Sequence, residues 1–152
     1  MTEEARHITG GKEKCLSFKK EERLHHRSLV ENLFRKGKNI YEFPFRVTWL
    51  AMTAEKLESC FRNGVPTTIG PLQMMVTVPK KKRKRAVDRV LMRRRIREAY
   101  RLNRIPLKVK VMENTDIRTL QLGIVYIHNA NLPYSTIEER LCKLLEKLKE
   151  KV

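Results

Sequence analysis

The sequence predicts an α/β (α+β) two-layer sandwich, in which helices pack on a small sheet in the order α-β-β-α-β-α. Two observations predict this class. Apolar residues recur at helical spacing in three segments and follow strand patterns in three others, and a strand, a helix and a further strand succeed one another, as in a crossover unit. The chain has 152 residues, 41% of them hydrophobic, which suffices for one compact domain. We therefore expect a single domain over residues 15–152 behind a flexible basic and polar arm at residues 1–14.

A helix and two strands are predicted in the first half. Apolar residues have helical spacing over residues 21–36, and Gly37 stands where a left-handed helix terminator is expected. Residues 43–52 alternate as a half-buried strand does, residues 53–70 indicate a short helix or loop, and residues 72–78 form a second strand. The strand 43–52 has a core side with Phe45, Val47 and Trp49, and a polar side, free for contact, with Pro44, Arg46 and Thr48.

The second half is predicted to contain a long helix, a strand and a final helix. Residues 85–103 have helical period, Pro106 is a stop signal, and a linker leads to a strand at residues 119–130. Ser135, with Glu138 three residues later, predicts a capping box that opens the last helix. The buried stripe of that helix is Leu141, Leu144, Leu145 and Leu148.

The net charge points to a polyanionic partner. The formal charge is +17, and a field of that sign concentrates nucleic acid or an anionic membrane around any fold. No apolar run approaches the roughly 20 residues of a spanning helix, and we expect no membrane partner. The start, MTEEARHITGG, carries acids where a secretory signal has a basic segment, which indicates a cytoplasmic protein. Cys15, Cys60 and Cys142 are odd in number and far apart, so we expect reduced thiols.

Positive charge is focused on the predicted long helix and the turn before it. Between Lys80 and Arg104 there are thirteen Lys or Arg and two acids, so this stretch carries +11 of the +17. On a helix, successive i, i+4 neighbours lie in one row, and like charges so aligned repel one another. The row therefore indicates a polyanion that neutralises it, and the planar fork of arginine suits phosphate. The row is Arg89, Arg93, Arg97 and Arg101, flanked by Arg94 and Arg104; the opposite side, Leu91, Met92, Ile96, Ala99 and Tyr100, is expected to dock on the sheet.

Other interpretations of this basic stretch remain. A run of Lys and Arg can be a solvated surface that keeps a protein soluble, although solubility does not require one row of arginines. A zipper-type DNA reader would need leucine heptads beyond the basic helix, where Pro106 stands instead. The string PKKKRKR would serve as a nuclear-import address, but short motifs of this kind often occur by chance. Because it joins a strand to the helix, we interpret it as the start of the phosphate-binding face.

The string TVPKKKRKRAVDRVLMRRRIREAYR from Thr77 resembles the signature of the bacterial ribonuclease P protein subunit. Lys80 and Lys81 stand at the paired lysines of the signature, and Arg89 at the first arginine of its core. Arg93 and Arg94 stand at its basic pair, and residues 97–101 match its closing Arg-Glu-x-aromatic-Arg motif. FKKEERL at residues 18–24 and Leu33-Phe34 with Gly37 resemble the family's opening, and the order of elements agrees from Leu16 to Lys149. Two departures stand out: Val90 and Leu91 replace the asparagine and second arginine of the family's core, and Val30 stands where relatives carry phenylalanine.

The resemblance implies an accessory subunit rather than a protein catalyst. In this family a large RNA performs the Mg²⁺-dependent removal of the 5′ leader from precursor tRNA, and the protein binds both that RNA and the leader. The Mg²⁺ is then held mainly by RNA, and no catalytic or metal-binding residue is expected in the protein. The resemblance and the charge pattern together give RNA-binding residues Lys80, Lys81, Arg85, Arg89, Arg93, Arg94, Arg97 and Arg101. The leader-binding cleft would contain Phe34, Arg46, Thr48 and Val30, with core packing as an equal alternative for Phe34 and the favoured one for Val30.

The histidines give no sign of a protein-borne active site. His25 and His26 are adjacent and would point in different directions on a helix, while His7 and His128 are isolated. No nucleophile, base and orienting residue can be assembled. The resemblance implies ribonuclease P RNA and precursor tRNA as partners, and no DNA is expected. The alternatives are a general RNA-binding or ribosome-associated protein on a similar scaffold without leader recognition, and a stand-alone nuclease or DNA-binding protein with an import signal.

Overall fold

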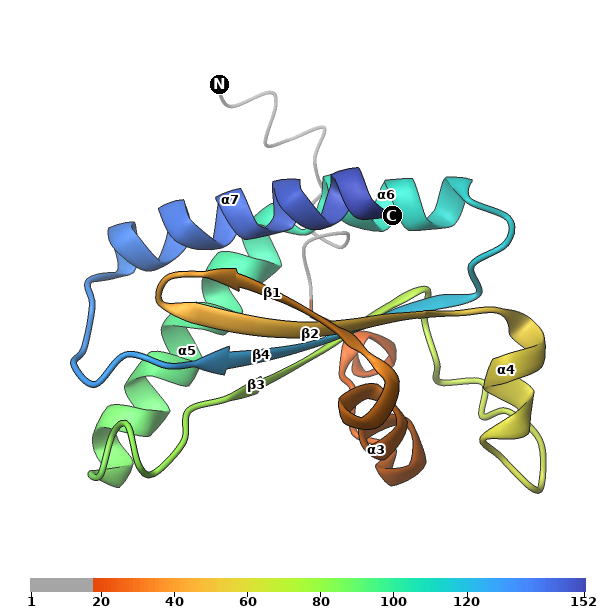
Figure 1. Cartoon of the computed structure of the whole chain (residues 1–152), viewed down its shortest axis with the longest axis horizontal. Coiled ribbons are helices and arrows are strands. Elements are labelled where there is room, and N and C mark those ends of the chain that lie inside the picture. Colours follow the sequence, from red (N-terminus) through yellow and green to blue (C-terminus); the bar gives the residue numbers. More distant parts are fainter. Residues whose placement is uncertain (1–17) are drawn as a thin grey trace.

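The computed structural model of the chain describes residues 18–152 (Figure 1). The predicted arm, residues 1–14, and Cys15 lie outside this range. Cys60 and Cys142 are free thiols, as expected. The elements, in chain order, are η1 Lys20–Glu22, α3 Arg27–Lys36, β1 Lys38–Glu42, β2 Phe45–Met52, α4 Ala54–Ser59, β3 Leu72–Thr77, α5 Ala86–Asn103, α6 Ile105–Glu113, β4 Thr119–Tyr126 and α7 Tyr134–Lys151.

The strands form one mixed sheet in the order β1-β2-β4-β3. The β1–β2 and β2–β4 pairs are antiparallel, whereas β3 and β4 are parallel and are joined by α5 and α6. This is the predicted crossover unit, and the predicted fold class is confirmed. Strand β1 was not predicted, because it is short and has one buried residue, Ile40, among polar neighbours. It pairs along one edge with β2 and forms a hairpin closed at Phe43-Pro44, a cis peptide bond.

The two faces of the sheet are covered differently. Helices α5, α6 and α7 bury one face in the larger apolar core, and the predicted core side of β2 is confirmed: Phe45 and Val47 are fully buried in this core. Figure 1 shows α7 on this side and α3 on the other. Under α3 a smaller cluster, built around Leu29 and Leu33, extends to Leu57 of α4. Burial of each such leucine stabilises the fold by about 1.5–3 kcal/mol.

The first helix is shorter than predicted. It begins at Arg27, because residues 20–22 form a 3-10 turn and the main chain then runs beside β3, where the Leu24 N–H donates to the Met74 carbonyl (3.1 Å). Gly37 is extended, with φ −72°, so the prediction of a left-handed terminator is wrong. A Cβ at Gly37 would lie 2.5 Å from the Leu33 carbonyl oxygen and 2.6 Å from Thr48 Cγ2. Glycine is required here because the end of α3 approaches β2 closely.

Helix α5 ends at Asn103, as predicted, but two other expectations differ from the structure. The predicted linker after α5 is wrong, because residues 105–113 form α6; Pro106 lies in its first turn, where a missing N–H leaves no hydrogen bond unmade. Helix α7 begins at Tyr134 with Pro133 at its N-cap, so the capping box at Ser135 is wrong. Glu138 instead accepts a hydrogen bond from Asn103 Nδ2 (3.1 Å). The predicted leucine stripe of α7 is buried as expected.

Within residues 18–152, no helix combines the length and the apolar character that crossing a membrane requires.

Candidate nucleic-acid interface

Helix α5 has one buried side and one basic side. Met92, Ile96, Ala99 and Tyr100 are fully buried against the larger core, as the sequence predicts, whereas Leu91, predicted to lie with them, is only partly buried. Burial of the phenol raises the pKa of Tyr100 far above its ordinary value. Because this side is fixed to the sheet, the arginine row is turned away from the core. Asp88 lies in the first turn, where a carboxylate is favoured by the helix dipole.

The four arginines of the row have different surroundings. At one end, Arg89 Nη1 donates to the carbonyl oxygens of Arg83 (3.0 Å) and Lys84 (2.7 Å). At the other end, Arg101 pairs with Glu98 (2.7 Å), and this hydrogen bond lowers the pKa of Glu98. Within the described part of the chain, Arg93 and Arg97 in the middle of the row make no hydrogen bond or ion pair. The middle of the row therefore offers its guanidinium donors to a ligand.

Arg104 does not flank a binding row, and that prediction is wrong. Its side chain is fully buried and forms an ion pair with Glu22, with Nη2 donating to Oε2 at 3.1 Å. Burial acts to raise the pKa of Glu22, but the hydrogen bond and charge of Arg104 outweigh it and the pKa is lowered. The pair fastens η1 to the junction of α5 and α6. Arg95 is likewise engaged, because it donates to the Leu132 carbonyl.

The basic turn, residues 79–85, is held by the loop that follows β4. Arg83 donates to the Asn129 carbonyl (2.7 Å) and to Asn131 Oδ1 (2.9 Å), and it pairs with Asp88 (3.2 Å). Asn131 donates in turn to Asp88 (3.0 Å). That hydrogen bond, with the charges of Arg83 and Arg85, lowers the pKa of Asp88. The sequence did not indicate the contacts of Asn131, which lies more than forty residues from both Arg83 and Asp88. Around this network Lys80, Lys81 and Arg85 are exposed, as is Arg94 of α5.

The sheet face beneath α3 can be described in rows from the strand register. One row joins Asn39, Thr48, Gly123 and Met75, and the next joins Tyr41, Arg46, Val125 and Thr77. Phe34 lies on the first row, because a Cβ at Gly123 would stand 2.8 Å from Phe34 Cζ. Its side chain is nevertheless 45% exposed. Phe34 is thus supported from below by the sheet and open to solvent above.

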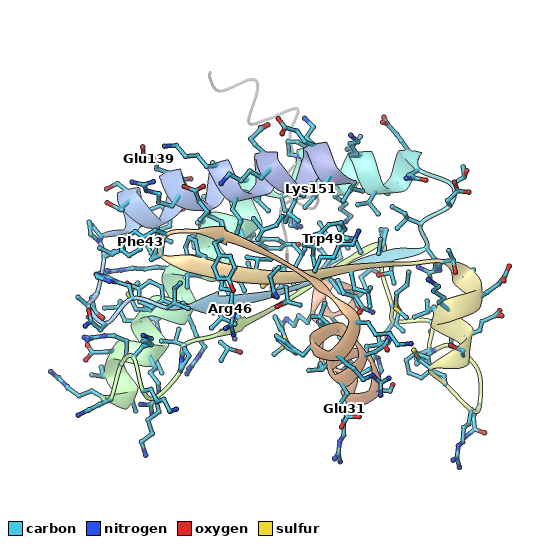
Figure 2. The ribbon with its side chains drawn as sticks, in the orientation of Figure 1. Glu31, Phe43, Arg46, Trp49, Glu139 and Lys151 are labelled. Atoms are coloured by element: carbon cyan, nitrogen blue, oxygen red, sulfur yellow. The ribbon has the colours of Figure 1, made fainter. Side chains whose placement is uncertain are left out.

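The other predicted leader-binding residues differ in exposure. Arg46 is partly exposed and is labelled in Figure 2 on the sheet side where α3 lies. Thr48 is buried, and its hydroxyl donates to Asn39 Oδ1 (2.8 Å). The prediction that the whole polar side of β2 is free is therefore wrong for Thr48, and also for Pro44, which is buried. Val30 is partly buried and packs against the smaller cluster, which agrees with the core packing favoured for it.

A hollow connects the arginine row to this sheet face. It has a volume of about 280 Å³ and lies between the segment before α3, strand β3 and helix α5. Arg97 of the row lines it together with Met75, the register partner of Gly123. Arg23 lines it as well, with its guanidinium 5.6 Å from the centre of the Phe18 ring. The row, the hollow and Phe34 therefore follow one another across a single surface.

The described residues do not provide a metal site. Residues 18–152 contain no group of three or more His, Cys, Asp or Glu side chains able to hold an ion. His25 and His26 do not point apart as predicted, because they precede α3; their rings lie 4.4 Å from each other. Burial, and then the neighbouring His25, lowers the pKa of His26.

Comparison with known proteins agrees with this geometry. Residues 18–149 match the family model described as Ribonuclease P. The ribonuclease P protein component of Porphyromonas gingivalis strain W83 is 32% identical over 127 residues, which cover 83% of this chain and 82% of that protein. Among solved structures, the RNase P protein of Staphylococcus aureus superposes with a TM-score of 0.59 at 16% identity, covering 84% of this chain and 95% of the other. That of Thermotoga maritima gives 0.58 at 18% identity, covering 83% and 96%. A family model over most of the chain and a relative of this identity establish the family, and the chain belongs to the ribonuclease P protein components, RNA-binding parts of a ribonucleoprotein endoribonuclease that matures the 5′ end of tRNA.

Proposed function

We propose that the protein binds the catalytic RNA of ribonuclease P through the basic turn and α5, and the 5′ leader of precursor tRNA across the sheet face beneath α3. The observation that carries the proposal is the continuous surface from Arg97, through the hollow, to Phe34 on Gly123. It combines cations that lack partners among the described residues with an exposed aromatic ring. These are the two components from which proteins build sites for single-stranded nucleic acid.

The two parts of the surface suit different forms of RNA. A-form helices have a major groove too narrow for side chains, so a protein contacts their phosphates and ribose hydroxyls. The exposed cations of the basic turn and the middle of the row suit such phosphates. An unpaired leader, in contrast, presents the faces of its bases, and Phe34 offers a ring on which one base stacks while Arg46 reaches the backbone.

The proposal assigns Mg²⁺ to the RNA. The family name implies a metal-dependent ribonucleoprotein, yet the described side chains offer no carboxylate cluster for such an ion. The residues of this chain contribute by binding and orienting the two RNAs, and none is given a chemical step. We expect this assembly to act in the cytoplasm.

The proposal is tested by cleavage of a precursor tRNA in Mg²⁺, with and without the ribonuclease P RNA of the same organism. We expect leader release to require the RNA and, at low RNA concentration, to increase when the protein is added. Phe34→Ala should remove part of this increase for long leaders and leave binding of the RNA subunit unchanged. RNA binding without any effect on cleavage would leave only a general RNA-binding protein. A preference for duplex DNA would contradict the proposal altogether.

A further inference from the structure

Exposed aromatic side chains are concentrated in one part of the molecule. Of the Phe, Tyr and Trp side chains in the described chain, those of Phe34, Tyr41 and Phe43 are exposed, by 45%, 62% and 52%. The proposed leader site uses Phe34. The other two belong to the β1–β2 hairpin, which Figure 1 shows at the end of the sheet where β4 also ends. Neither is required by the core, because the hairpin buries Ile40 and Phe45 there instead.

Phe43 packs against a third ring, and Tyr41 lies two residues before it on the same hairpin. The Phe43 ring lies 4.9 Å from that of His128, at an interplanar angle of 70°. His128 belongs to the loop after β4, which is tied to the hairpin where the Ile127 N–H donates to the Pro44 carbonyl (2.9 Å). Tyr41 is the register partner of Arg46 and therefore shares the sheet face proposed for the leader. We call Tyr41, Phe43 and His128 the hairpin ledge; Figure 2 labels Phe43 at the hairpin tip.

Tyr41 extends the proposed leader surface, while Phe43 and His128 lie at the end of the sheet, beside the loop that holds the basic turn. The loop that carries His128 also provides Asn129 and Asn131, the partners of Arg83. The acid of the hairpin, Glu42, is turned to the opposite face, where it pairs with Lys147 (2.6 Å) and Arg140 (3.3 Å). A leader whose phosphate backbone passes Arg46 thus reaches the exposed rings of the ledge. Cations of the basic turn lie close by, and the hairpin carboxylate, Glu42, is neutralised by its ion pairs.

We propose that the hairpin ledge is a second stacking site for unpaired bases of the leader, beyond the nucleotides bound at Phe34 and Arg46. The inference rests on the proposed function and extends it. Stacking on Tyr41 and Phe43 requires no particular base, because every base has an aromatic face. The ledge therefore binds leaders that are long enough to reach it, whatever their sequence.

The test measures binding of precursor tRNAs with leaders of increasing length to the complex of protein and ribonuclease P RNA. We expect Phe43→Ala and Tyr41→Ala to bind short-leader substrates like the wild type. Long-leader substrates should bind at least about fivefold more weakly, the lower end of what loss of one base–aromatic stack causes. Phe43→Tyr should restore the wild-type affinity. Met112→Ala on α6 is the matched control. Met112 is 61% exposed, close to the value for Tyr41, but lies outside the proposed surface.

A second measurement uses the unmodified protein. A leader carrying 2-aminopurine at successive positions should lose fluorescence at the position near Phe34 and again further from the cleavage site, where the base stacks on the ledge. The second loss should disappear in Phe43→Ala, whose folding is verified by its thermal unfolding temperature.

The outcomes separate the two proposals. If the wild type shows no dependence on leader length, both leader recognition and the ledge are wrong. If length dependence is present and sensitive to Phe34→Ala, yet unaffected by Phe43→Ala and Tyr41→Ala, only the ledge is wrong. If Phe43→Ala and Tyr41→Ala weaken the binding of tRNA without a leader by the same factor, the ledge is also wrong, since the hairpin then contacts another part of the complex.

Discussion

At the scale of single residues, two arginines that are close in the sequence differ in their surroundings. Arg97 has no ion-pair partner among the described residues and lines the hollow beside β3, whereas Arg104, seven positions later, is buried against Glu22. A buried ion pair contributes little net stability, because the loss of hydration offsets the attraction. Removing one partner is costly, since the other charge stays buried. Arg104 therefore matters for folding, whereas Arg97 is available for the proposed RNA binding.

Glu22→Ala should lower the free energy of unfolding at pH 7 by about 3–5 kcal/mol, the range for breaking a buried pair. Urea unfolding measures this difference. The double variant Glu22→Leu with Arg104→Met is the control, and we expect it to recover most of the loss because no charge is left buried. If both variants are equally unstable, the fold depends on the shape of these side chains rather than on their charges.

The lowered pKa of Glu22 also gives a pH dependence. Its folded pKa lies below its ordinary value of 4.5, so its contribution to stability is present above about pH 4.5 and is lost as the pH falls through the folded pKa. As the pH is lowered below about 4.5, the free energy of unfolding should therefore fall less for Glu22→Ala than for the wild type.

At the scale of elements, α3 and β4 meet where glycine leaves room for an aromatic ring. Gly123 is buried in the middle of β4, and a Cβ there would approach Phe34 Cζ to 2.8 Å and Leu33 Cδ2 to 3.2 Å. The ring is the movable part of this contact, because it is the far end of an exposed side chain. The strand thus determines where Phe34 lies, although Phe34 belongs to the helix.

Gly123→Ala should displace the Phe34 ring and weaken the binding of long-leader substrates. Binding of the ribonuclease P RNA alone should not change, since an added Cβ at Gly123 would meet side chains of α3. Paired affinity measurements with and without a leader make the test. Phe34→Ala is the matched comparison, and the double variant should be no worse than Phe34→Ala alone. An additive loss would show that the two residues act independently.

At the scale of the whole molecule, +11 of the net charge of +17 belongs to residues 80–104, which include most of the basic turn and all of α5. Helix α7, which packs against α5, carries side chains of both signs. Each phosphate contact changes log K by about −0.7 to −0.9 per unit of log salt, because counterions are released. The slope of log K against log salt therefore reports how many phosphates the protein contacts.

Arg93→Ala with Arg97→Ala should weaken RNA binding and reduce the steepness of its salt dependence by about 0.7–0.9 for each contact removed. Lys143→Ala with Lys151→Ala on α7 removes the same charge from exposed positions away from the row. The control should change affinity slightly and leave the slope unchanged. If both pairs reduce the slope equally, binding follows total charge and not the row.

Local patterns predicted much of this fold, and contacts between distant segments explain what they missed. The two sides of α5 and the leucine stripe of α7 follow from periodicity within one segment. The partner of Arg104 is eighty-two residues away, and the reason for Gly37 is Thr48 on another element. The hairpin ledge depends on which aromatic side chains the sheet leaves uncovered, and residue type does not reveal this. The RNA-binding and leader-binding residues themselves stay predictions until the RNA complexes are measured.

The anchoring of the basic turn by Arg83, Asp88 and Asn131 affects how quickly the protein can capture RNA. Six consecutive cations, Lys80 to Arg85, would repel one another and sample many shapes if nothing restrained them. The loop after β4 fixes one shape in advance, so the turn loses little conformational entropy when RNA arrives. Association can then proceed at a rate governed by diffusion and electrostatic attraction, without waiting for a segment to fold.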